Sequence, residues 1–250
     1  MKRKLLICTL MIIGLLSVIL SGCRKKYTPI AIFQYEENED GTLTITGLTD
    51  KGKTETEITV PSTLDDKQVK AIGSGAIRDN VQLKKVVIKE GITSVSSNAF
   101  LSDYNLTDIE FPSTLKEIGS NAFTETTWLS RKQNEGNEII VNNILVMVNE
   151  TGENYNVPEG IEAIAEGAFY ANEKIAKVKF SSTVKTIGNY AFYGCRSLTE
   201  VDLNEGLESI GYCAFADSGL KSVNLPASVR ALGKDAFLNV PDVTYGNGKS

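Results

Sequence analysis

Few side chains in this sequence are of the types that do chemistry. The 250 residues include no histidine, which excludes a Ser-His-Asp triad, a Cys-His pair and a histidine-bearing zinc site. Carboxylates remain: Asp108, Glu110, Glu200 and Asp202 lie at exposed positions of short expected strands, where two of them could form an acid–base pair. Such a pair needs one carboxyl group whose pKa is raised by an apolar pocket, whereas neighbouring lysines favour ionisation here. We therefore expect no catalytic residue, no enzymatic activity and no cofactor.

The four cysteines also offer little chemistry. Cys8 lies in an N-terminal apolar run and Cys23 directly follows it, whereas Cys195 and Cys213 have neither CxxC nor metal-ligand spacing. Because these last two lie at different offsets in a repeat, packed free thiols are favoured over a disulfide. The acidic segment 38–41 is too short a fragment of a calcium loop, so we expect no metal site.

The N-terminus has the pattern of an export signal. Three basic residues precede an apolar run of 16 residues, Leu5 to Leu20, which is short for a membrane span and typical of a signal peptide over residues 1–22. The run closes with Leu-Ser-Gly-Cys, which resembles the lipobox of bacterial lipoproteins and implies acylation of Cys23. An uncleaved anchor helix is the alternative. Either way we expect a chain held outside the cytoplasmic membrane, with residues 23–32 as a lipidated tether.

Charge excludes one class of partner. Without residues 1–22 the chain keeps 23 basic and 31 acidic residues, a net charge of −8. It lacks the basic stripe that phosphate binding requires, so we expect no nucleic-acid partner.

A repeat of 23 residues organises the rest of the chain. Its landmark is an Ala-Phe pair, spaced by 23 residues except for one double interval of 46 and a last interval of 22, at Ala99, Ala122, Ala168, Ala191, Ala214 and Ala236. A second apolar series keeps the same step and usually precedes a glycine, which suits a tight turn. A third series, such as Leu198, Val201 and Leu203, ends in the period-2 step of a short strand.

This period predicts a solenoid over residues 58–250. No unit can bury its apolar side chains alone, whereas stacked units form one continuous apolar column. A spacing of about 4.8 Å per coil predicts a rod on the order of 40 Å long. Binding would then use the sides of the rod, and nothing in the repeat specifies an oligomeric state.

These motifs resemble the BspA-like, treponemal-type leucine-rich repeats over about residues 55–245. The resemblance rests on Leu198-x-x-Val201-x-Leu203, then Ile210-Gly211 and the following Ala-Phe pair. It implies a right-handed coil of short β-strands with short helical or 3₁₀ turns. It also implies a secreted or surface-anchored bacterial protein. Some members of the family are implicated in adhesion to host proteins or other cells. Ile77 departs from the pattern, as does a shortened last unit.

Two segments are irregular. Residues 33–57 read as a β-hairpin that caps the N-terminal end of the column. Residues 127–157 form the double unit, with Trp128 and a second hairpin that turns at Asn142 and Asn143. Since both strands of this hairpin are apolar on both faces, packing against Trp128 is favoured over a projecting ligand loop.

Two sets of exposed side chains are candidate ligand-binding residues. On successive coils, Lys85 should lie beside Asp108, and the second row consists of Lys177, Lys179, Glu200 and Asp202. These are either cross-strand ion pairs or, with Glu110, a charged binding surface. Tyr170 and Tyr193 should stack, with Tyr190 and Tyr212 nearby, as a self-packed ladder or an aromatic strip that grips a protein or glycan.

The sequence therefore predicts a lipid-anchored, extracytoplasmic leucine-rich-repeat protein of the bacterial membrane or cell surface. Its expected role is that of a protein-binding or adhesion module, because the repeat offers a large surface and no catalytic apparatus. The alternative is a structural or accessory envelope lipoprotein without a host-directed ligand.

Overall fold

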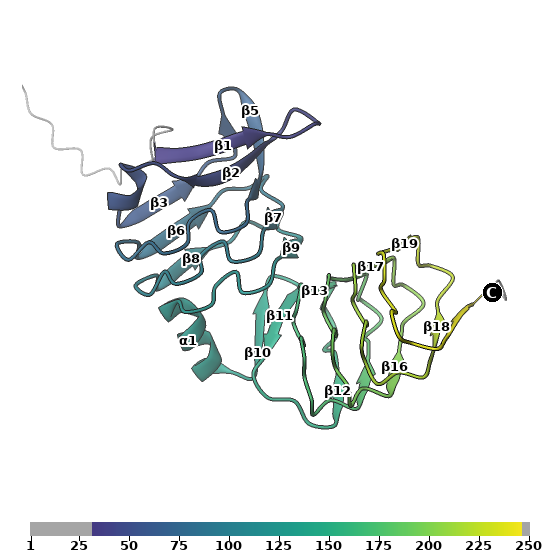
Figure 1. Cartoon of the computed structure of the whole chain (residues 1–250). Helices are drawn as coiled ribbons and strands as arrows, with labels where there is room; N and C mark the ends of the chain where they lie inside the picture. The colour runs from purple at the N-terminus through teal and green to yellow at the C-terminus, as the bar shows by residue number, and fades with distance from the viewer. Residues whose placement is uncertain (1–31, 247–250) are drawn as a thin grey trace, which may run out of the picture.

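The computed structural model describes residues 32–246, and the chain forms a solenoid that bends into an arch (Figure 1). Strands on the hollow side of the arch, here called inner strands, form two sheets. The first has the order β1-β2-β5-β7-β9, with β4 beside β5, and its members are Phe33–Glu37, Leu43–Leu48, Lys67–Ile72, Ser94–Val95, Glu117–Ile118 and, for β4, Thr63–Leu64. The second has the order β10-β11-β13-β15-β17-β19, and its members are Glu138–Val141, Ile144–Val148, Ala163–Ile164, Thr186–Ile187, Ser209–Ile210 and Ala231–Leu232.

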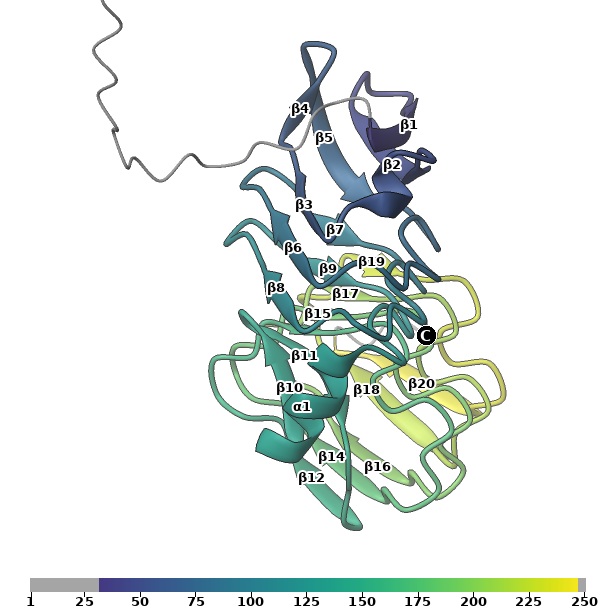
Figure 2. The same cartoon turned by 90° about the vertical axis from the view of Figure 1, so that its left-hand side faces the viewer.

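The remaining strands, here called outer strands, lie on the opposite side of the coils (Figures 1 and 2). They form three small parallel sheets, β3-β6-β8, β12-β14-β16 and β18-β20. Their bounds are Glu57–Val60, Lys85–Ile88 and Asp108–Glu110, then Asn154–Asn156, Lys177–Lys179 and Glu200–Asp202, then Ser222–Leu225 and Asp242–Tyr245. Partners such as Val178 and Val201 are one repeat apart, so the period of the sequence is the register of the sheets.

The Ala-Phe pairs build the interior. Rings on neighbouring coils stack nearly parallel, with 4.7 Å between the centroids of Phe169 and Phe192 and 5.0 Å between Phe192 and Phe215. Phe192 and Phe215 are fully buried. Because each ring covers the next, removing one ring leaves a cavity between two coils.

The repeated glycines serve close packing between coils. A Cβ atom on Gly211 would lie 2.5 Å from the backbone nitrogen of Asn189, and one on Gly119 would lie 2.2 Å from that of Ser97. The turn itself does not require glycine, since neither has a positive φ. These positions exclude side chains because the preceding coil lies against them.

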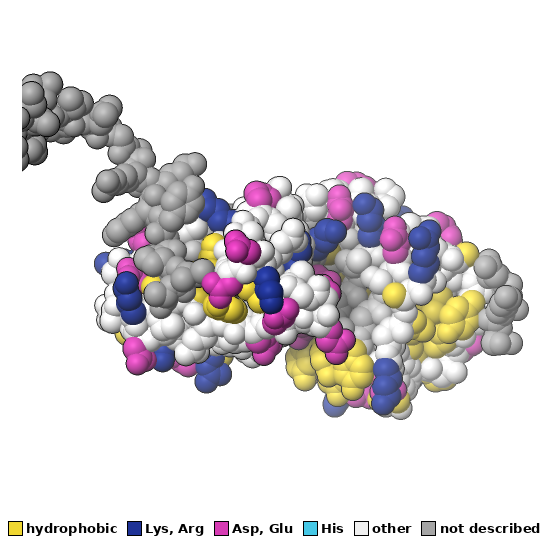
Figure 3. Space-filling view, turned by 90° about the horizontal axis from the view of Figure 1, so that it is seen from above, with side chains coloured by type: hydrophobic (Ala, Val, Ile, Leu, Met, Phe, Trp, Pro, Cys, Tyr) yellow, Lys and Arg dark blue, Asp and Glu magenta, His cyan; other side chains and the backbone are white. Residues whose placement is uncertain are grey.

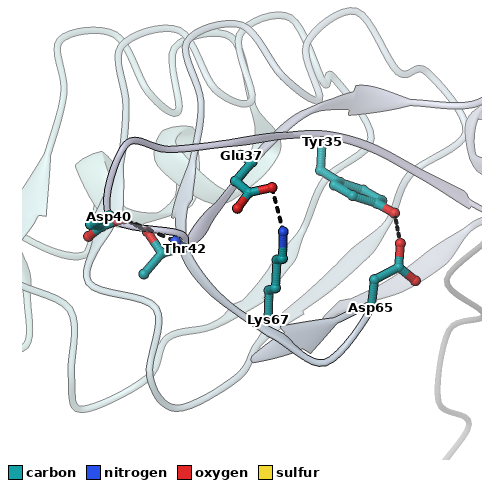
Figure 4. A network of polar contacts seen from close by, with 6 residues as sticks. All are labelled: Tyr35, Glu37, Asp40, Thr42, Asp65 and Lys67. Atoms are coloured by element: carbon teal, nitrogen blue, oxygen red, sulfur yellow. Dashed lines mark hydrogen bonds and ion pairs between the residues drawn. The ribbon is translucent and has the colours of Figure 1, made fainter.

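The N-terminal hairpin closes one end of the solenoid. Strands β1 and β2 pair antiparallel, and a short 3₁₀ helix at Gly52–Thr54 follows them. Figure 4 shows polar contacts that join β1 to the β4–β5 hairpin: Tyr35 donates to Asp65, and Lys67 pairs with Glu37. In the β1–β2 turn, Asp40 accepts hydrogen bonds from the Thr42 amide and hydroxyl at 3.0 and 2.6 Å.

The solenoid is not a uniform rod, because it bends at the double unit (Figure 1). There the chain forms an α-helix, α1 (Thr127–Glu135), and then the antiparallel β10–β11 hairpin. The Thr126 hydroxyl caps this helix by accepting a hydrogen bond from the Leu129 amide at 3.0 Å. Trp128 packs on Phe123 at 4.9 Å and shares a core with the hairpin. Because a helix and a hairpin replace a regular coil, β9 and β11 belong to different sheets and the solenoid bends between them (Figure 1).

Candidate binding surfaces

Outer strands β6 and β8 carry the first predicted charged row. The Lys85 Nζ lies 3.3 Å from Asp108 and 2.5 Å from Glu110, which confirms the predicted neighbour pair. Hydrogen bonds to Glu110 and Asp108 raise the pKa of Lys85, so its ammonium form is favoured. All three side chains lie at the surface, where such pairs contribute about 0–1 kcal/mol each.

Outer strands β14 and β16 carry the second row. Lys177 pairs with Glu200 at 2.7 Å and Lys179 with Asp202 at 3.8 Å, also as predicted. The hydrogen bond with Glu200 raises the pKa of Lys177. This row belongs to a different sheet from Asp108 and Glu110. The structure therefore does not unite the charged candidates into one site, and Asp108, Glu110, Glu200 and Asp202 are all exposed.

The predicted tyrosine cluster forms on the turns of the C-terminal half. The Tyr170 and Tyr193 rings stack with centroids 5.3 Å apart, and Tyr190 contacts both Tyr193 and Tyr212 edge-on. A hydrogen bond to Asp217 raises the pKa of Tyr193. The rings pack on one another, yet Tyr170 remains 57% exposed. This cluster thus presents aromatic faces to solvent while forming a ladder.

A groove along the inner strands was not anticipated from the sequence. It runs from β7 and β9 across β13 to β19 with a volume of about 1290 Å³, and Figure 3 looks into the hollow between the two halves. The lining mixes apolar and polar side chains, and its polar members include Ser94, Ser96, Lys116, Glu117, Asn143, Glu162, Lys185, Thr186, Ser209 and Arg230. The bend creates this groove, because it turns the inner strands of the two halves toward one another.

Charges alternate along the C-terminal coils, where Glu162, Lys185 and Arg230 line the groove. Glu162, Lys185, Glu208 and Arg230 hold equivalent places on four successive coils, joined by backbone hydrogen bonds of 2.8 Å. The Lys185 Nζ also lies 3.6 Å from a Glu162 carboxylate oxygen. Each residue stands two places before the apolar residue of the glycine series. That periodicity indicates that these side chains share one face of the coils. It did not indicate that this face borders a groove.

Buried or half-buried side chains with polar atoms occupy a third repeating position. Asn80, Asp103 and Thr126 are each one repeat apart, as are Asn172, Cys195 and Ser218. Asp103 is fully buried. One carboxyl oxygen accepts a hydrogen bond from the Asn80 backbone amide at 2.7 Å, while the other oxygen has no partner among the described residues. Burial, with a smaller contribution from the charge of Asp79, raises the pKa of Asp103 to about 8.

The two cysteines of the solenoid are buried and free, which confirms the preference for packed thiols. The Cys195 thiol donates to the Phe169 carbonyl at 3.0 Å, and burial raises its pKa to about 11. It is therefore a packing side chain and not a reactive nucleophile.

Two further observations concern metal binding and membrane insertion. Over residues 32–246, no three acidic or cysteine side chains converge as metal binding would require. Within the same residues no helix has the length and apolar character to cross a membrane. The proposed signal peptide and Cys23 lie outside the described residues.

Stacked coils of 23 residues with columns of short parallel strands define a leucine-rich-repeat solenoid. The family model described as "BspA type Leucine rich repeat region" matches residues 53–146 and 148–244 in six copies. The chain belongs to this family, as the motifs indicated. Leucine-rich-repeat proteins generally bind protein ligands and are typically non-catalytic scaffolds.

Solved structures and curated proteins were also compared with the chain. The Treponema pallidum leucine-rich-repeat protein is 25% identical, with a TM-score of 0.45 over 77% of this chain and 89% of its own. A leucine-rich cell surface protein of Faecalibacterium prausnitzii is also 25% identical, with a TM-score of 0.38 over 84% of this chain and 51% of its own. The pneumococcal vaccine antigen PcpA is 17% identical, with a TM-score of 0.39 over 80% and 75%. No curated protein matched.

Proposed function

We propose that this protein is a surface-exposed binding module that holds a protein partner in the groove of its inner strands. The observation that carries the proposal is the groove itself, about 1290 Å³ and lined by side chains from coils of both halves. A site shared by many coils can contact an extended stretch of a partner, which suits protein binding better than catalysis.

The groove's charges favour selectivity over strong attraction. Glu162 and Lys185 already pair with each other, and acidic and basic side chains alternate along the coils. A partner gains from the groove only if its own charges alternate in the matching register, because a like charge placed opposite is repelled. The exposed serine and threonine hydroxyls supply neutral hydrogen bonds between these charges.

Lipid anchoring is the second part of the proposal. The sequence ending in Cys23 matches the pattern of a lipoprotein signal, and acylation there would tether the solenoid outside the membrane. Replacing Cys23 with alanine should move the protein from the membrane fraction to the soluble fraction. Continued membrane attachment would instead support an uncleaved anchor helix.

The outer charged rows and the tyrosine cluster remain separate candidates for partner contact. Tyr170 offers an exposed aromatic face of the kind that stacks on protein or sugar rings. The rows of β8, β14 and β16 are neutralised by their own ion pairs, which makes them weaker candidates than the groove. The binding test must therefore compare these surfaces.

The test is binding of the purified protein to matrix proteins, mucins and bacterial surface fractions. A groove variant, Lys185→Glu with Arg230→Glu, should weaken any saturable binding at least tenfold. The matched control on the outer strands, Lys177→Glu with Lys179→Glu, makes the same change of charge and should retain binding. Loss in the control alone would move the site to the outer row. Absence of any saturable partner would favour an accessory envelope role.

A further inference from the structure

Backbone hydrogen bonds join the Ala-Phe turns of neighbouring coils in a regular pattern. At one junction the amides of Asn98, Phe100 and Ser102 donate to the carbonyls of the next turn at 2.9, 2.8 and 3.0 Å. Three bonds in the same places, of 2.7–3.2 Å, occur at five junctions between adjacent turns. This ladder is the turn-side counterpart of the strand pairing.

The ladder is interrupted at the double unit. Among residues 32–246, the amides of Asn121, Phe123 and Glu125 have no hydrogen-bond acceptor, although their equivalents donate at the other junctions. The carbonyls of Glu166, Ala168 and Tyr170, which hold the accepting places of the next turn, likewise receive no donor from the described chain. The cause is local: the inserted unit supplies a helix and a hairpin but no Ala-Phe turn, so one rung of turns is missing.

The missing turn leaves a pocket of about 230 Å³ between the two walls. Leu129 of α1 and Val146 and Met147 of β11 give it apolar lining, and Tyr170 lies beside it. The walls meet at one end, where the Glu166 amide donates to the Ile118 carbonyl at 3.1 Å. The pocket is therefore a slot with amide donors along one wall, carbonyl acceptors along the other and an apolar lining between them.

We propose that this slot binds a short extended segment of a partner protein, whose backbone replaces the missing turn. An extended segment offers carbonyls to the free amides and amides to the free carbonyls, as in strand addition to an open sheet edge. The slot is smaller than the roughly 300–1,000 Å³ of ordinary small-molecule pockets, so it takes in only part of the segment and is too small for a drug-sized ligand.

The surroundings define the segment further. At the intact junctions an alanine and a phenylalanine point inward, and Ala99 and Phe100 are both fully buried, so an apolar residue should face the lining. Glu166 lines the slot, which disfavours an acidic segment. The inference rests on the proposed role in protein binding, but it concerns a different surface from the groove.

The first experiment needs no ligand. Hydrogen exchange of the full-length protein in detergent should be faster by at least tenfold at Asn121, Phe123 and Glu125 than at Asn98, Phe100 and Ser102, because only the latter amides are bonded between turns. Equal protection of the two sets would mean that the slot is closed, and it would overturn the proposal.

The second experiment uses two probes: a blocked peptide copying the intact turn at residues 187–194 and a displayed library of random octapeptides. Binding should slow exchange at the three free amides. Val146→Trp, which fills the slot, should lower affinity at least tenfold, whereas Ile140→Trp, at an exposed site on the same hairpin, should not. Thermal melts of both variants check that the chain remains folded.

The outcomes separate this slot from the groove. Peptides that bind the Val146→Trp variant as well as the parent, or absence of any enriched peptide, would overturn the slot. The groove variant Lys185→Glu with Arg230→Glu should retain peptide binding. If that variant loses no partner while the slot still binds peptides, only the proposed groove function fails.

Discussion

Replacing Asp103 with asparagine should make the protein less sensitive to rising pH. Asp103 is fully buried in the first half of the solenoid, where it accepts one hydrogen bond from the Asn80 backbone amide and forms no ion pair with any of residues 32–246. Its pKa rises from 3.8 to about 8. In the folded protein this side chain is therefore protonated at neutral pH, whereas in the unfolded chain it is ionised.

The direction and size of the effect follow from proton linkage. Because the folded state holds the proton more tightly, the contribution of Asp103 to stability is fully present below about pH 4 and is lost as the pH rises to about 8. Each rise of one pH unit in this window lowers the free energy of unfolding by about 1.4 kcal/mol. Between pH 4 and pH 7 the parent should therefore lose on the order of 4 kcal/mol relative to Asp103→Asn, which cannot ionise.

Urea unfolding, followed by the fluorescence of the single tryptophan Trp128, measures this difference between pH 4 and pH 8. The free-energy gap between Asp103→Asn and the parent should grow steadily across that window. Asp242→Asn removes an exposed carboxylate as a control and should give a nearly flat difference. A gap for Asp103→Asn that does not change with pH would refute the reasoning, because it would mean that Asp103 is ionised inside the fold.

Three further changes test the packing. Gly211→Ala should lower the thermal midpoint by several degrees, since its Cβ would lie 2.5 Å from the Asn189 nitrogen, while Gly136→Ala, which has no atom within 4 Å of the added Cβ, should leave the midpoint nearly unchanged. Phe192→Ala should cost about 3–5 kcal/mol in urea unfolding, because the ring is buried between two stacked neighbours; a loss below about 1 kcal/mol would contradict a continuous column. Cys195 should resist a thiol reagent at pH 8 in the folded protein and react rapidly once unfolded, because burial raises its pKa to about 11; fast labelling of the native state would show that the site opens.

Much of the regular architecture could be predicted because the repeat keeps a nearly constant period of 23 residues. Side chains 23 residues apart become neighbours on adjacent coils, so the stacking of Tyr170 on Tyr193 and the pairing of Lys177 with Glu200 followed from spacing alone. Family membership followed from the same motifs. The reason for the glycines was only partly predicted: close approach of the preceding coil, rather than turn conformation, excludes a side chain at Gly211.

The irregular unit could not be predicted in the same way. The capping threonine before Trp128 is a local signal for α1, although no helix was predicted in this segment. Whether the unit would continue the rod or bend it depended on how a helix and a hairpin fill the space of one coil. That outcome is a property of three-dimensional packing, which has no period to read.

The sequence by itself determined the repeat, the family and which side chains share a face, because neighbours in a solenoid are set by distance along the chain. The tertiary structure decided the bend, and the bend created the two sites proposed here. The groove exists because inner strands of both halves face one another, and the slot exists because one turn is missing from the ladder. Both depend on contacts between elements that no single repeat contains.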